Sequence, residues 1–85
     1  YRGKPALTAR LITFDNLYFS LGKHFNPGSA AIIPLDRLLL ETDDSEIDIA
    51  DIAARVAAAK GISAALVTSA TTATALSIFP ELEIV

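Results

Sequence analysis

Residues 33–46, with the sequence IPLDRLLLETDDSE, run directly from the most apolar part of the chain into its most acidic part. Three consecutive leucines, residues 38–40, lack the alternation of polar and apolar side chains that marks a strand with one face in water. Such a run is typical of a parallel sheet covered by helices on both faces. We therefore expect a doubly buried strand over residues 37–42, with acidic side chains at its carboxyl end.

The sequence before this strand predicts a helix, another strand and a turn. Apolar residues at helical spacing predict a helix over residues 5–15, with Asn16 as its stop. The segment LYFSLG, residues 17–22, is too short for a helix and is closed by Gly, which predicts a strand. The sequence Asn-Pro-Gly at 26–28 indicates a turn, followed by a short helical turn.

Two helices are predicted after the acidic segment. Ser45 and Asp48 have the spacing of a capping box, so we expect a helix that starts at Ser45 and ends at Gly61. A last helix is expected over residues 63–79, and residues 80–85 form a tail. The order helix, strand, loop, strand, helix, helix indicates a parallel α/β fold. Two strands do not make a stable sheet alone, so we expect the fold to be incomplete on its own.

Composition supports this expectation. The chain has 85 residues, 52% of them hydrophobic, and a mean hydropathy of +0.45. A chain of this size buries roughly 60% of its surface, so part of the apolar surface is expected to pack against another protein segment. The sequence contains no Met and opens with YRGKP, from which we expect a fragment of a longer protein. No apolar run reaches the ~20 residues of a membrane span, and no signal peptide is recognisable, which predicts a cytoplasmic protein without a membrane partner.

Some classes of function are excluded by the residues that are missing. The absence of Cys removes disulfides, thiolate nucleophiles and zinc fingers. The serines show no nucleophile-elbow pattern, and the sequence has no phosphate-binding glycine-rich loop. The net charge is −3, and a mildly basic stretch before Glu41 is only a weak signal for nucleic-acid binding.

The acidic segment after the leucines has two interpretations. In open α/β sheets and in (β/α)8 barrels, functional side chains lie at the carboxyl ends of the strands, which is the position of residues 41–44. Alternatively, Asp44 and Ser45 only cap the next helix. His24 follows the other strand and would lie at the same end if the strands are parallel, but a single His in such a loop is more often a surface residue.

A family resemblance favours a functional role. The segment PLDRLLLETD, residues 34–43, and the later ARVAAAKGIS, residues 54–63, resemble the C-terminal portion of the TatD-related deoxyribonucleases. These are metal-dependent hydrolases of the amidohydrolase type, built on a (β/α)8 barrel. The resemblance implies that residues 1–79 are about the last two βα units of such a barrel. LLLETD resembles the last barrel strand, LYFSLG the strand before it, and YRGKPAL the stretch that follows the metal-binding His of the sixth strand.

The resemblance assigns one site residue. Asp43 matches the Asp of the family's Glu-Thr-Asp motif, a metal-site carboxylate that also orients or deprotonates the attacking water; Glu41 matches a supporting position. The other ligands would precede Tyr1. The complete enzyme would use a divalent metal (Mg, Mn or Zn) and bind DNA, whereas the isolated chain would be inactive and need hold no metal. Two departures are that Asp44-Ser45 replaces a small residue and Pro, and that TTATAL, residues 71–76, lacks the family's Asn.

Two functions from different classes therefore stay open. The first is a part of a metal-dependent phosphodiesterase, partnered by the remainder of the barrel. The second is a non-catalytic, self-associating α/β fragment or engineered module, since the stretch between Ile52 and Phe79 carries only two charged residues.

Overall fold

The computed structural model describes residues 1–42 and 48–78. Within these ranges the chain is a small α/β structure, with four α-helices, a single turn of 3-10 helix and a two-stranded parallel sheet. The elements in chain order are α1 (Pro5–Leu11), β1 (Phe19–Leu21), α2 (Pro27–Ile32), the 3-10 helix η1 (Leu35–Arg37), β2 (Leu38–Leu40), α3 (Ile49–Lys60) and α4 (Ala64–Ile78).

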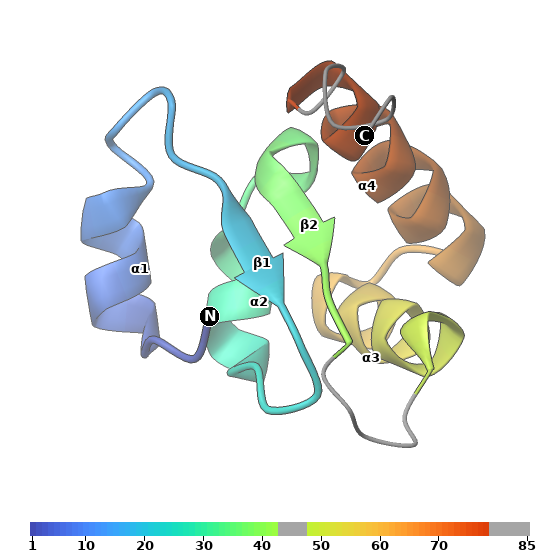
Figure 1. The fold of residues 1–85 in the computed structure, drawn as a ribbon. Coiled ribbons are helices and arrows are strands. Elements are labelled where there is room, and N and C mark those ends of the chain that lie inside the picture. Colours follow the sequence, from blue (N-terminus) through green and yellow to red (C-terminus); the bar gives the residue numbers. More distant parts are fainter. Residues whose placement is uncertain (43–47, 79–85) are drawn as a thin grey trace.

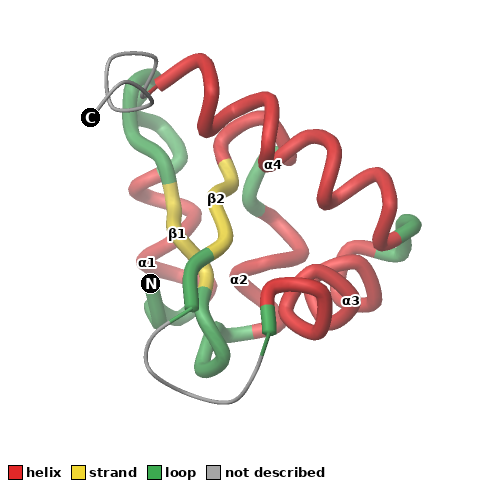
Figure 2. Tube along the Cα trace, turned by 45° about the vertical axis from the view of Figure 1, so that its right-hand side comes forward, coloured by secondary structure: helices red, strands yellow, loops and turns green. Residues whose placement is uncertain are grey.

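The two strands are parallel and neighbours, as the sequence predicts. Ser20 pairs with Leu39, and the N–H of Glu41 donates to the carbonyl of Leu21 at 3.0 Å, one residue beyond β2. Parallel strands need a crossover connection, which α2 and η1 provide here. Figure 1 shows α1 on the β1 side of this sheet and α4 on the β2 side, with α2 behind the strands. The same order along the sheet is visible after the rotation in Figure 2.

The core lies between the sheet and the helices α2, α3 and α4. Phe19, Leu21 and Leu38 point to this side and are at most 2% exposed. They form one apolar cluster with side chains from the helices, among them Ile33, Ile52, Val56 and Val67. This cluster orients the strands, and it therefore also positions the segments that follow them.

The expectation that the leucine strand is buried on both faces is wrong for the described part of the chain. Leu38 is fully buried, but Leu39 and Leu40 are only half-buried. Both line an apolar groove against α4, together with Ile49 and Leu76. The helices described here cover one face of β2 well and leave a groove beside it.

The ends of two helices differ from the predicted ones. α1 ends at Leu11, and not at residue 15, because the guanidinium of Arg37 takes up carbonyl groups beyond it. α3 begins at Ile49 with Asp48 as its N-cap, whose carboxylate accepts from the N–H of Ala50 at 2.7 Å. The predicted cap at Ser45 is therefore wrong, and Ser45 itself lies outside the described residues.

Other predicted boundaries are confirmed. Gly61 ends α3 in the left-handed conformation, with φ of 68°, which a residue with a Cβ rarely adopts. The hydroxyl of Ser63 accepts from the N–H of Leu66 at the start of α4. The last described residue of α4 is Ile78, so the predicted end at Phe79 and the tail 80–85 lie outside the described ranges.

Within those ranges, no single helix combines the length and the apolar composition needed to cross a membrane. Only α3 and α4 taken together have that length and composition, and a bend of 110° separates these two helices.

Candidate functional site at the strand ends

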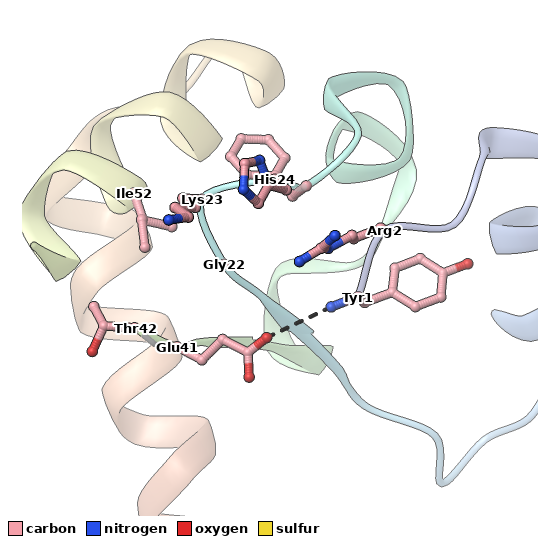
Figure 3. A pocket seen from close by; sticks show the side chains of 9 residues that line it. Tyr1, Arg2, Gly22, Lys23, His24, Glu41, Thr42 and Ile52 are labelled. Atoms are coloured by element: carbon pink, nitrogen blue, oxygen red, sulfur yellow. Dashed lines mark ion pairs between the residues drawn. The ribbon is translucent and has the colours of Figure 1, made fainter. Parts of the chain in front are cut away.

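A cavity of about 240 Å³ lies at the carboxyl ends of the two strands. Three separate segments line it, and Figure 3 shows their side chains around one space. They are residues 1–2, residues 22–25 directly after β1, and residues 41–42 directly after β2. The helix α3 closes one side with the buried side chain of Ile52. We call this space the strand-end cavity.

Residues 1–2 reach the cavity because the start of the chain lies along β1. The amino group of Tyr1 donates to the carbonyl of Ser20 at 2.5 Å, and its ring contacts Phe19 edge-on, with the ring centroids 5.1 Å apart. The segment before α1 thus lies next to β1, on the side away from β2. Arg2 follows and extends toward the loop after β1 (Figure 3).

A network of buried hydroxyl groups holds the same segment. The hydroxyls of Tyr1 and Thr8 are 2.8 Å apart, and Thr8 donates to the hydroxyl of Ser29, also at 2.8 Å. Ser29 in turn donates to the carbonyl of Gly3 at 2.5 Å. Thr8 and Ser29 are at most 1% exposed, and the bond between them is buried. They tie the first residues to both α1 and α2, and this fixes one wall of the cavity.

Gly22 allows the two strand ends to approach each other. A Cβ at this position would lie 3.3 Å from Cγ of Glu41, which is tighter than almost all real contacts of this kind. Without that atom, the Glu41 side chain lies against the backbone after β1. Its carboxylate is 3.7 Å from the amino group of Tyr1, and the Glu41 side chain is 54% exposed. An ion pair so exposed contributes little to stability.

The cavity wall is rich in basic side chains. Arg2, Lys23 and His24 line it, with Glu41 as the one acidic residue among the described lining residues. Arg2 and His24 are exposed and Lys23 is half-buried. A shifted pKa is found elsewhere, at Lys60, whose ammonium group donates to the carbonyl of Ile33. Partial burial lowers the pKa of Lys60 from its usual value, and this group lies at the far end of α3.

The predicted site residues are partly brought together. Glu41 and His24 share the cavity, as parallel strands require, but Asp43 and Asp44 lie outside the described residues. In the part of the chain that is described, no three His, Cys, Asp or Glu side chains are grouped so that they could hold a metal ion.

Arg2 and Lys23 were not anticipated as site residues. For Lys23 the signal was available, because it follows the predicted strand 17–22 at the carboxyl end. Arg2 had no such signal in the residue pattern, since its position depends on the contact of Tyr1 with β1.

We compared the chain with known proteins by a scan against protein-family models, a search of curated proteins and a search of solved structures, and none of the three found a match.

Proposed function

We propose that the chain is the C-terminal part of a (β/α)8 barrel and belongs to a cytoplasmic, metal-dependent phosphodiesterase of the TatD-related type that acts on DNA. In this proposal Asp43 supplies a carboxylate to the metal site, and the remainder of the barrel supplies the other ligands. The isolated chain is inactive.

One observation carries the proposal. The three segments that the resemblance assigns to the ends of successive barrel strands, residues 1–2, 22–25 and 41–42, line a single cavity. Functional groups in such barrels come from the carboxyl ends of several strands. Asp43 is the next residue after Thr42, which lines the cavity. This arrangement supports a strand-end site to which Asp43 contributes.

The proposed chemistry needs ligands from the remainder of the barrel. When bound, a divalent metal would polarise the phosphoryl oxygens and activate a water. Two-metal sites hold ions about 3.5–4 Å apart with several His and carboxylate ligands. Because the described residues gather no such group, we derive no catalytic step through a metal. The role assigned to this chain is the supply of one carboxylate and of the cavity wall.

A cleavage assay tests the proposal. The polypeptide that carries this sequence is purified from its source, its intact mass is measured, and cleavage of a labelled DNA oligonucleotide is followed with Mg²⁺ or Mn²⁺. We expect a longer polypeptide, or a companion fragment with the missing histidines, and a loss of about 10²–10⁴-fold in kcat on Asp43→Asn, as for removal of a general base. A native mass of 9.0 kDa without any cleavage, or a rate that Asp43→Asn leaves unchanged, would refute the proposal. Cleavage by the isolated 85-residue chain that depends on Asp43 would refute its inactivity.

A second candidate function rests on the exposed apolar surface. Large apolar side chains are 40–59% exposed at Leu7, Phe14, Tyr18, Ile32, Ile49, Leu66 and Leu76. Residues 64–78, which form α4, include no charged residue, and the groove of about 240 Å³ between α4 and β2 is largely apolar. Under this candidate the chain is a non-catalytic module that covers these surfaces by self-association.

Sedimentation velocity separates the two candidates. A self-associating module gives a concentration-dependent dimer or larger species, and Leu76→Glu, at an exposed residue that lines the apolar groove, returns it to a monomer. A stable monomer of 9.0 kDa at high concentration would exclude self-association.

A further inference from the structure

The basic residues of the strand-end cavity point to a ligand. We propose that this cavity binds a phosphate group, with the guanidinium of Arg2 as the main donor and with Lys23 and His24 as further donors. A guanidinium is planar and presents paired N–H groups that match two phosphate oxygens, whereas a lysine acts as a point charge. The three side chains come from two segments that meet only because residues 1–2 lie along β1.

The size of the cavity fits this ligand. Clefts that hold drug-sized ligands are about 300–1,000 Å³, and the strand-end cavity has about 240 Å³. It therefore suits a small group with several acceptor oxygens better than a whole nucleobase with its sugar. Its opening lies at the ends of the strands, where Arg2 and His24 are exposed and reach solvent.

Among the described lining residues of the cavity, basic side chains outnumber acidic ones. The protein carries −3 at pH 7, which repels an anion in general. Among the described lining residues, Arg2 and Lys23 are positive and Glu41 is negative. Saturable binding of an anion to this acidic protein would thus point to these side chains and not to a general attraction.

This inference rests on the proposed function for the origin of the phosphate, which would belong to the DNA substrate. The phosphate could be a terminal monoester, an internal diester or free phosphate, and these share the same acceptor oxygens. The site itself needs neither a metal nor cleavage, so it is tested separately from the proposed function.

The experiment is a ¹H–¹⁵N NMR titration of the 85-residue chain in EDTA, at constant ionic strength. The probes are inorganic phosphate, thymidine 5′-monophosphate, and thymidylyl-thymidine without a terminal phosphate. We expect saturable shifts of the amides of Arg2, Gly22, Lys23 and His24 with at least one probe, and the probe that binds tightest identifies the kind of phosphate. Arg2→Gln should weaken this binding about tenfold or more, because a charge-assisted hydrogen bond is lost.

Arg10→Gln is the matched control, since Arg10 is exposed on α1, does not line the cavity and undergoes the same change in charge. Its affinity should equal that of the unsubstituted chain. His24→Gln is a second variant at an exposed position, and it should also weaken binding without changing the fold. Shifts that stay linear with all three probes, or an equal loss in the Arg2 and Arg10 variants, would overturn the proposal. If phosphate binds to the chain but Asp43→Asn leaves DNA cleavage unchanged, the phosphate site stands and only the proposed function fails.

Discussion

Replacing Arg37 by Met should destabilise the fold strongly, because Arg37 joins the segment before β2 to the loop between α1 and β1 by three hydrogen bonds. It ends η1 and donates three hydrogen bonds to carbonyl groups of the loop between α1 and β1. These bonds are Nε to Leu17 at 2.8 Å, Nη1 to Ile12 at 2.6 Å and Nη2 to Phe14 at 2.5 Å. The guanidinium carbon also lies 5.8 Å from the centre of the Phe19 ring. Met retains much of the apolar stem and removes every one of these donors.

The expected loss follows from the hydrogen bonds. A hydrogen bond contributes about 0.5–1.5 kcal/mol net to stability, so three contribute about 1.5–4.5 kcal/mol. Since the bond to Phe14 is exposed and water can replace it, the two other bonds dominate, and we expect a loss of about 2 kcal/mol in the free energy of unfolding. A chain of this length has a total of about 4–13 kcal/mol. The same loss lowers Tm by about 8–16 °C.

Urea unfolding followed by far-UV circular dichroism measures this change. Arg37→Lys should recover less than half of the loss, because a single ammonium group cannot reach three carbonyls with the geometry of the guanidinium. Arg10→Met is the control, since Arg10 is exposed in the last turn of α1 and is expected to contribute less than about 1 kcal/mol. An unfolding free energy of Arg37→Met within about 0.5 kcal/mol of the original, or full recovery by Lys, would refute the reasoning.

Three further substitutions test the cavity wall and the buried groups. Ser29→Ala should cost about 1–3 kcal/mol in urea unfolding, because it leaves the buried hydroxyl of Thr8 and the carbonyl that Ser29 served with one partner fewer; a cost under about 0.5 kcal/mol would contradict the network. Gly22→Ala should weaken phosphate binding by displacing Glu41, with stability kept or raised by up to about 1 kcal/mol, and an unchanged affinity in the NMR titration would contradict this. Lys60→Met removes a group whose pKa in the folded chain lies below 10.5. The original chain should therefore gain stability relative to the variant as the pH rises through the folded pKa toward 10.5, and lose that stability as the pH falls. A stability difference in urea unfolding that does not change with pH would show that burial does not act on Lys60.

Much of the fold could be predicted from local pattern. The run of leucines at 38–40 and the short aromatic segment before Gly22 each predict a strand, and the length of chain between them predicts a parallel pair. Gly61 was predictable as a helix end because the left-handed conformation favours Gly so strongly. These features depend on residues close together in the sequence.

The two errors in helix boundaries have different origins, one distant in the sequence and one local. The end of α1 is set by Arg37, which lies more than twenty residues later in the sequence and takes up the carbonyls of Ile12 and Phe14. The start of α3 was predicted too early, because Ser45 and Asp48 have the spacing of a capping box, whereas Asp48 is itself the N-cap.

The candidate site was predictable only where it follows from the parallel arrangement of the strands. Once the strands are parallel, His24 and Glu41 must lie at one end, which the cavity confirms. Arg2 could not be placed, because the start of the chain is brought alongside β1 by contacts between residues far apart in the sequence, among them the hydrogen bond from Tyr1 to Ser20. The assignment of Asp43 to a metal site remains a prediction, since that residue lies outside the described part of the chain.

The two ends of the sheet are therefore expected to respond differently to substitution. At the amino ends of the strands, Arg37 is tied to three carbonyls, and its removal should lower stability. At the carboxyl ends, Arg2 and His24 are exposed, and exposed polar side chains usually change stability by less than about 0.5 kcal/mol. Residues whose loss costs little stability can be chosen for binding alone. The basic residues of the strand-end cavity are thus expected to contribute little to folding, whereas the hydrogen bonds of Arg37 at the opposite end stabilise the strands. Folding and ligand recognition would then depend on different residues.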